Sequence, residues 1–387
     1  MSVPYWRLSG FYFFYFATLG VYLPYWNLYL KDIGFNPVDI GQLSALLIAT
    51  RIIGPNIWGW LSDRTGKNLA IIRITLFFGA LVSTGFLFVH GFWLLCVITL
   101  GFGFFWNAAL PQFEAITLGH LKDEPHRYSR IRLWGSIGFI ATVLGLGWVL
   151  DSQPVSILPA VVTALLAANW LVTLAMPKAK PQPPGLMQIG IMEILKRSEV
   201  LAFLFVNMLL QAAHGPYYVF YSLYLKELHY SATLTGCLWA LGVFAEIILF
   251  INMQSLLGRY SLRSILLLSL FLATGRWLLI GWGGGYLALL ICAQLLHAAS
   301  FGAAHVAAIH LVHHYFGPEH QGKGQALYSS LSFGLGGMVG SLYSGYYWES
   351  LGSRFVYTMA ALLCYLGFVI AYFWVRQEKT QNDSALG

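Results

Sequence analysis

The residues of this sequence that could do chemistry are charged and titratable side chains that interrupt long apolar runs. Two arginines and two glutamates lie inside such runs and a third arginine begins one: Arg51, Arg276, Glu114, Glu246 and Arg132. Four histidines lie in others: His214, His297, His305 and His310. In a bilayer, a charge at the centre of a helix costs roughly 2.5 to 3.5 kcal/mol, so it needs a partner or a water-lined cavity. The pattern indicates ion binding and proton transfer, or an ion cluster that ties helices together.

The composition assigns the chain to the lipid bilayer. Its 387 residues are 58% hydrophobic and 10% charged, whereas a soluble domain carries about a quarter charged residues. A spanning helix needs about 20 apolar residues, and the apolar runs predict twelve spans. These are 7–30, 40–62, 69–89, 92–118, 131–150, 154–176, 199–225, 234–257, 263–282, 286–314, 324–348 and 354–375. The connections are too short for a globular domain, so any activity must lie between helices.

The basic residues predict the orientation of the chain. Seventeen Lys and Arg fall in one set of alternate connections and three in the other. Because basic connections stay in the cytoplasm, we expect both termini there. The net charge of +7 then reflects membrane topology, and no nucleic-acid partner is expected. The first span lacks a small-residue cleavage site, so it is expected to be a retained helix and not a signal peptide.

An internal repeat divides the chain in two. Adding 195 to residue numbers in the first two spans gives ten identities in a 27-residue window, including Leu28-Tyr29-Leu30-Lys31 on Leu223-Tyr224-Leu225-Lys226. The repeat predicts an all-helical membrane protein with a six-helix bundle at 1–177, a cytoplasmic linker at 178–198, a second bundle at 199–376 and a disordered cytoplasmic tail at 377–387. Repeats of this kind place a substrate site at mid-membrane between the halves. The same offset carries Arg51 onto Glu246.

The motif Gly-Trp-Leu-Ser-Asp-Arg-Thr-Gly-Lys at 59–67 resembles the loop signature of the major facilitator superfamily. The resemblance implies twelve helices in two bundles related by pseudo-two-fold symmetry, and a gating role for Asp63 and Arg64. Within that superfamily, several stretches resemble the phenylpropionate permease family of proton-coupled aromatic-acid importers: 15–34, 130–136, 211–218, 238–246, 275–277 and 294–297. This second resemblance covers essentially the whole chain and implies the bacterial inner (cytoplasmic) membrane.

A more distant resemblance is to lactose permease and its oligosaccharide–proton symporter relatives. Their sugar-binding Glu and Arg fall on Glu114 and Arg132, and their helix-nine Arg and helix-ten His fall on Arg276 and His297. Two departures argue against a sugar substrate and an identical proton path. Ser300 stands where the carboxylate central to proton transfer would be, and the helix-eight Glu maps to Val243, with Glu246 one turn further along.

We therefore expect some of the ionisable residues to bind the substrate and others to carry the proton. Arg276 or Arg51 would hold a substrate carboxylate, while Glu246 with His297 or His305 would take up and release a proton. A carboxylate loses its proton more readily beside a cation, so a substrate anion that competes for an Arg would drive protonation of Glu246. The alternative is that Arg51, Glu246 and Arg276 form a structural ion cluster between the bundles.

Aromatic residues at helical spacing are further candidates for substrate binding. His214, Tyr217 and Tyr218 follow the i, i+3, i+4 pattern, and Tyr22 lies on a similar stripe of the first span. Together they could form an aromatic wall. Interfacial aromatic belts and ordinary helix packing produce the same stripes, so both interpretations stay open.

Several other functions are not supported. The four cysteines form no CxxC motif, so neither a disulfide framework nor a thiolate metal site is expected. The histidines at 310, 313 and 314 lack further ligands, and we expect no metal and no cofactor. The segment 317–324 resembles a phosphate loop but lacks its Ser or Thr, and there is no HExxH motif, so the chain is not expected to be an enzyme.

The sequence therefore predicts a monomeric secondary transporter that imports a small organic anion with protons by alternating access. An aromatic carboxylate such as a phenylpropionate-like acid is the expected substrate. The first alternative is a sugar or nucleoside symporter, favoured by Glu114 with Arg132 and by the aromatic wall. An efflux antiporter is less well supported, because 135–145 lacks the Gly-Pro signature of such antiporters. A non-transporting membrane sensor would have a similar sequence.

Overall fold

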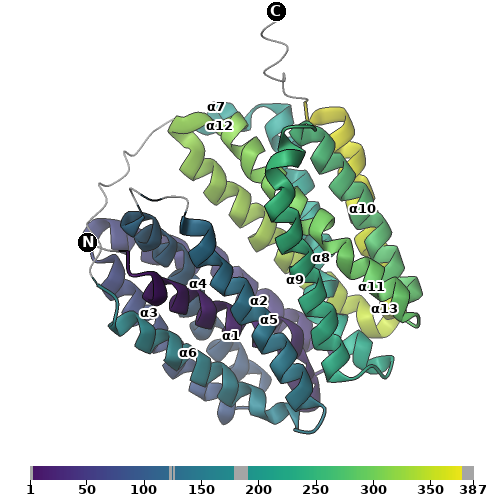
Figure 1. Ribbon diagram of the computed structural model, residues 1–387. Helices are drawn as coiled ribbons and strands as arrows, with labels where there is room; N and C mark the ends of the chain where they lie inside the picture. The colour runs from purple at the N-terminus through teal and green to yellow at the C-terminus, as the bar shows by residue number, and fades with distance from the viewer. Residues whose placement is uncertain (1–2, 122–123, 125–126, 178–190, 377–387) are drawn as a thin grey trace, which may run out of the picture. The chain divides into compact units, whose positions relative to one another are not determined.

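The computed structural model describes residues 3–121, 124, 127–177 and 191–376, and its regular elements are all helical (Figure 1). Long helices are expected because backbone N–H and C=O groups in hydrocarbon must be paired within their own segment. Most of the predicted linker, 178–190, and the predicted tail, 377–387, lie outside the described residues.

The first half of the chain contains six long helices, and each overlaps a predicted span. They are α1 (Tyr5–Asp32), α2 (Pro37–Thr65), α3 (Asn68–Ser83, continued by the 3₁₀ turn Thr84–Leu87), α4 (Phe92–His120), α5 (Tyr128–Leu150) and α6 (Leu158–Leu174, preceded by the 3₁₀ turn Val155–Ile157). The ends of α2 follow local rules. Asn36 and Asp39 form a capping box at its start, and Gly66 adopts the left-handed conformation, φ 65°, after its end.

The second half begins with the short helix α7 and three long helices. These are α7 (Ile191–Leu195), α8 (Ser198–Glu227), α9 (Ala232–Leu257) and α10 (Leu262–Gly283). A continuous helical stretch follows: α11 (Leu287–Leu295), the π-helix η4 (Ala298–Ala303), α12 (Ala304–Ser329), the π-helix η5 (Ser330–Gly336) and α13 (Gly337–Trp374).

Two glycines break the stretch Leu287–Trp374 into three spans. Gly317 and Gly352 have φ values of 66° and 81°, which residues with a side chain rarely adopt. The breaks lie between the last three predicted spans. In the described part of the chain, nine helical stretches are long and apolar enough to cross a membrane, and this stretch is one of them. Dividing it into three and adding the 28-residue α1 gives the twelve predicted spans.

The chain forms two compact units whose boundary runs through α8 and α9. Unit 1 contains Met1–Leu186 and Tyr218–Ala240, and unit 2 contains Met187–Tyr217 and Leu241–Gly387. The tip of the α8–α9 hairpin thus packs with the first half of the chain. The bundle boundaries at 177 and 199 describe the sequence repeat and stay a prediction.

In unit 1, α1 packs on α5 and α6. The α1–α5 contact is close because glycine replaces a side chain where the backbones meet. A Cβ added at Gly138 would lie 2.2 Å from the carbonyl oxygen of Phe13, and one at Gly20 would lie 3.0 Å from that of Phe139. Small residues at helix crossings in lipid let backbones approach in this way.

The hairpin tip is held in unit 1 by polar contacts. The Asn27 amide donates to the carbonyl of Val219 over 2.8 Å. At the start of α9, the Asp151 carboxylate accepts hydrogen bonds from the Ala232 amide over 2.7 Å and from the Thr233 hydroxyl over 2.5 Å. The Thr233 hydrogen bond, together with those from the backbone amides, holds the pKa of Asp151 below its ordinary value. Asp151 therefore caps the N-terminus of a helix far from it in sequence.

Both units use an arginine on the third span of their half to cap the C-terminal end of the sixth. Arg73 on α3 donates to the carbonyl oxygens of Thr173 and Leu174, each over 3.1 Å. Arg263 on α10 donates to that of Tyr372 over 2.5 Å. Carbonyl groups at a helix end lack intrahelical donors, and a cation also interacts favourably with the helix dipole there. The shared device is consistent with the internal repeat.

Replacing Gly138 by Ala tests the close contact between α1 and α5. The added methyl group would overlap the Phe13 carbonyl, so Gly138→Ala should destabilise the protein by about 1–3 kcal/mol, as overpacking does. The matched control on the same helix is Gly145→Ala, because no atom lies within 4 Å of an added Cβ there. Thermal unfolding in detergent measures both variants. Equal midpoints for the two would show that α1 and α5 do not pack this closely.

Candidate functional site

The centre of the candidate site in unit 2 is the buried guanidinium of Arg276 on α10. The residue is 0% exposed. Its Nε donates to the carbonyl of Ala293 over 3.0 Å, and its Nη1 donates to the hydroxyl of Ser300 over 3.2 Å. The guanidinium carbon lies 4.4 Å from the ring centroids of both Tyr217 and Trp277. These contacts fix the planar cation in one orientation beside two aromatic rings.

His214 on α8 completes the near surroundings of this cation. Its Nδ1 lies 2.8 Å from the carbonyl oxygen of Leu210, and its Nε2 lies 3.4 Å from Nη1 of Arg276. A carbonyl can only accept, so Nδ1 carries the hydrogen and Nε2 presents a lone pair to the guanidinium. His214 is therefore placed as a neutral hydrogen-bond acceptor, a role that needs no change of charge.

A second group of buried polar side chains adjoins Arg276. The Tyr217 hydroxyl donates to Oε1 of Gln294 over 2.9 Å, and the ring of His297 lies 5.8 Å from that of Tyr217. Nε2 of Gln294 and Nδ1 of His297 are buried and have no hydrogen-bond partner among the described residues. Buried donors and acceptors rarely stay unpaired. These two atoms are therefore where a water molecule or a bound ligand would add hydrogen bonds.

The π-helix η4 places further groups next to this cluster. It begins immediately after His297 and includes Ser300 and Gly302. A Cβ added at Gly302 would lie 3.1 Å from Cγ of Glu246, so the half-buried Glu246 packs against this turn of helix. π-Helical turns occur frequently at functional sites. The structure thus brings Arg276, His214, Tyr217, His297 and Glu246 into one unit.

His305 lies on the same helical stretch beyond an intervening ring. Phe301 stacks on His297 with centroids 5.3 Å apart and on His305 with centroids 6.1 Å apart. The Nδ1 of His305 lies 3.2 Å from the hydroxyl of Tyr328. The two histidines are therefore separated by a phenyl ring, which neither accepts nor donates a proton.

Unit 1 contains the predicted pair of Glu114 and Arg132. Their nearest atoms, Glu114 Oε1 and Arg132 Nε, are 3.9 Å apart, and both side chains are about one-third exposed. The Tyr128 hydroxyl donates to Glu114 over 3.5 Å. The guanidinium carbon of Arg132 lies 4.0 Å from the Phe16 ring centroid and 5.5 Å from that of Tyr12. A carboxylate and a guanidinium side by side among aromatic rings can bind a polyhydroxylated ring by hydrogen bonds and stacking.

The other residues predicted to bind substrate are spread over several helices. Arg51 is half-buried on α2, within electrostatic reach of the Tyr22 hydroxyl. The Tyr22 ring stacks on Trp26 with centroids 5.0 Å apart, so its observed contacts are those of helix packing. Tyr218 stacks on Trp239, with centroids 6.5 Å apart, in unit 1 and not in the unit that holds Tyr217.

The two residues assigned to gating lie at the C-terminal end of α2. Asp63 and Arg64 are exposed, and the guanidinium carbon of Arg64 lies 5.3 Å from the ring centroid of Trp60. Among the residues that the structure describes, no group of three or more His, Cys, Asp or Glu side chains could hold a metal ion.

Sequence reasoning missed the contribution of Gln294 and treated Ser300 only as a departure from a family pattern. Both contact the cluster directly. Their spacing from His297, three residues on either side, was the available signal, because positions three apart lie on one face of a helix. The π-helical turn that extends this face was not visible in the sequence.

Comparison with known proteins supplies the family. The sequence model of the MFS_1 like family matches residues 5–359. The chain belongs to the major facilitator superfamily. It is a multi-pass membrane protein and a secondary transporter, not an enzyme, as the sequence predicted.

Three relatives of this superfamily member illustrate its range. It is 31% identical over 366 residues to the "Probable 3-phenylpropionic acid transporter" of Escherichia coli strain K12, covering 92% of this chain and 94% of that protein. It is 25% identical to the maltose permease of Geobacillus stearothermophilus, covering 96% and 95%. The crystal structure of the nucleoside transporter NupG superposes with a TM-score of 0.84 at 18% identity, covering 97% and 98%, which confirms the fold.

The Tyr217–Gln294 hydrogen bond offers a test of how far the polar cluster is coupled. Tyr217→Phe leaves the buried Gln294 amide without this donor and should cost about 1–3 kcal/mol. Adding Gln294→Leu removes both partners and should recover much of that loss. Tyr343→Phe is the control, because the buried Tyr343 hydroxyl has no hydrogen-bond partner in the described chain. Thermal unfolding of these three variants measures the effect, and a double variant less stable than Tyr217→Phe would contradict the pairing.

Proposed function

We propose that this transporter imports a small organic anion, an aromatic carboxylate such as a phenylpropionate-like acid, together with protons. The observation that carries the proposal is the Arg276 guanidinium, which is fully buried and flanked by the Tyr217 and Trp277 rings. A fixed cation attracts a carboxylate, and neighbouring rings offer stacking surface to an aromatic body. The 31% identity to a relative named for 3-phenylpropionic acid supports the same substrate class.

Proton coupling is proposed to operate through Glu246, with His297 as the second titratable group. Both adjoin the π-helix η4. This helix follows α11, whose residue Ala293 accepts a hydrogen bond from Arg276. An anion that enters this region competes with Glu246 for nearby positive charge, which favours protonation of the carboxyl group. Substrate and proton would then move in one step. His305 is the third candidate carrier, and the Phe301 ring separates it from His297.

The available driving force limits how many protons must accompany each substrate anion. One proton carried with one monovalent anion moves no net charge, so only the pH gradient would drive uptake. Use of the membrane potential, worth about 2.3 kcal/mol per charge per 100 mV, requires a second proton. Glu246 and His297 together would supply two carriers.

The remaining features of the proposal concern topology and gating. The basic connections favour both termini in the cytoplasm of a bacterium, with the chain in the inner membrane. The sequence repeat favours two six-helix bundles that alternate access to a central site. Arg51, Tyr22 and Tyr218 are proposed to contribute to substrate binding, and Asp63 with Arg64 to gating. The protein is proposed to act as a monomer.

A second candidate function is proton-coupled uptake of a sugar or nucleoside. The specific observation in its favour is the pair Glu114 and Arg132 beside the rings of Phe16 and Tyr12. The 25% identity to a maltose permease is consistent with it. Ser300 and Val243, which replace carboxylates of the oligosaccharide symporters, weigh against it.

A ligand screen on the purified protein discriminates between the two functions. We expect 3-phenylpropionate to raise the unfolding temperature, because a ligand that binds only the folded state stabilises it by about 2.7 kcal/mol at one hundred times its Kd. Its uncharged amide should have little effect, since it lacks the charge that Arg276 attracts. Maltose and uridine are the competing probes. Stabilisation by either of them without any by the acid would replace the proposed substrate class.

The coupling role of Glu246 predicts a split between two transport assays. In proteoliposomes, Glu246→Gln should abolish accumulation of substrate driven by a pH gradient, because the amide cannot carry a proton. Counterflow exchange, which needs no net proton movement, should persist. Glu193→Gln, on the short helix α7 outside the spans, is the matched control and should retain both activities. Full uphill uptake by Glu246→Gln would rule out this carrier.

A further inference from the structure

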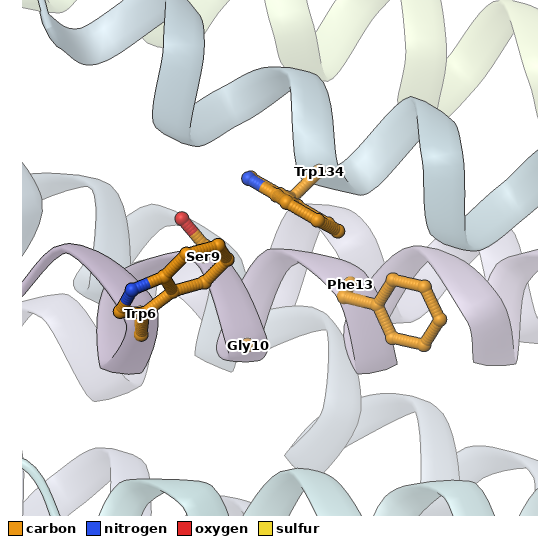
Figure 2. A pocket seen from close by; sticks show the side chains of 5 residues that line it. All are labelled: Trp6, Ser9, Gly10, Phe13 and Trp134. Atoms are coloured by element: carbon orange, nitrogen blue, oxygen red, sulfur yellow. The ribbon is translucent and has the colours of Figure 1, made fainter.

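Two cavities lie close together where α1 and α5 begin. One, of about 280 Å³, is lined by Tyr5, Arg127 and Arg130. The other, of about 260 Å³, is lined by Trp6, Ser9, Gly10, Phe13 and Trp134 (Figure 2). Neither contains a residue of the candidate transport site.

The two cavities adjoin through Tyr5. Its hydroxyl accepts a hydrogen bond from Nε1 of Trp134 over 3.1 Å, and its ring lies 5.2 Å from that of Trp6. The rings of Trp6 and Trp134 meet edge to face with centroids 5.6 Å apart. In Figure 2, Trp6 and Phe13 project from α1 on either side of Gly10, and Trp134 faces them from α5. The cavity lined by Arg127 and Arg130, here called the basic end, thus continues into the cavity lined by Trp6, Phe13 and Trp134, here called the aromatic groove.

The basic end has a net positive charge. Arg127 forms a salt bridge of 2.5 Å with Glu124. Arg130 forms no salt bridge with any residue in the described part of the chain. Among the described residues of this end, two guanidinium groups against one carboxylate leave a charge of +1. The planar donor fork of arginine matches the oxygens of a phosphate group.

Ser9 is a second and independent indication of a ligand. It lines the aromatic groove, is 2% exposed, and its Oγ has no hydrogen-bond partner among the described residues. A buried hydroxyl without a partner is uncommon, because it can both donate and accept. Here it lies within the wall of an open groove, where a polar group of a bound molecule would pair with it.

We propose that these cavities form a binding site for one anionic phospholipid. Arg127 and Arg130 would bind its phosphate, Ser9 would pair with an ester oxygen of the glycerol, and an acyl chain would lie along the groove of Trp6, Phe13 and Trp134. The position suits a lipid, because the site lies at the first turns of two spans, where headgroups and chains meet. Trp6 is 71% exposed, as an aromatic residue at the membrane interface is. A free anion would use the basic end alone and leave the groove empty.

The test measures the unfolding temperature of the full chain in a neutral detergent. Phosphatidylglycerol should raise it by several degrees, whereas phosphatidylcholine and inorganic phosphate should not. Arg130→Gln, and Arg127→Gln with Arg130→Gln, should weaken the apparent affinity for phosphatidylglycerol at least tenfold. Arg259→Gln removes the same charge from an exposed site in unit 2 and should leave that affinity unchanged. Trp6→Ala, at an exposed position, should also weaken it.

Three results would overturn the proposal. A rise with inorganic phosphate equal to that with phosphatidylglycerol would make the ligand a free anion. Equal rises with phosphatidylglycerol and phosphatidylcholine would remove the role of the headgroup charge. An equal loss of affinity for phosphatidylglycerol in Arg259→Gln would show that only the net charge of the protein matters. If the double variant does not fold, Arg130→Lys serves instead; it keeps the charge without the fork, and should weaken binding by less than Arg130→Gln does.

Discussion

The organisation of unit 2 depends on one constraint, the burial of a cation that cannot lose its charge. An arginine removed from water must find its hydrogen bonds within the protein. Arg276 finds them in the carbonyl of Ala293, the hydroxyl of Ser300 and the lone pair of His214, from three separate helical segments. The tautomer of His214 fits that demand, because its Nε2 must accept from a group that can only donate. The same demand makes the region responsive to any other charge that enters it.

The fold was predictable because a chain segment in lipid must pair its own backbone polar groups, which favours helices. Apolar runs of about 20 residues predict helices, and the breaks at Gly317 and Gly352 separate the last three of them where the sequence suggested. The site was predictable only in part. The proximity of Glu114 and Arg132 followed from a family resemblance, but the contacts of Arg276 with Ala293 and Ser300 depend on how α10 packs against η4. No periodicity of a single helix contains that information.

Helix α8 has a role that its sequence pattern alone did not reveal. Tyr217 and Tyr218 are neighbours in the chain, yet the first belongs to the polar cluster of unit 2 and the second stacks on Trp239 in unit 1. One residue later, Val219 accepts the hydrogen bond from Asn27. The continuous helix α8 therefore carries residues of the candidate site in unit 2 and, from the next position on, residues that pack within unit 1.

The separation of the histidines bears on the proposed proton coupling. His297 and His305 stack on opposite sides of Phe301, so a proton passing between them would require water around that ring. Glu246 packs against Gly302, on the turn that follows His297. His305 also has a partner of its own in the Tyr328 hydroxyl. The two proposed carriers Glu246 and His297 thus adjoin one π-helical turn in the unit that holds Arg276, whereas His305 lies beyond the Phe301 ring.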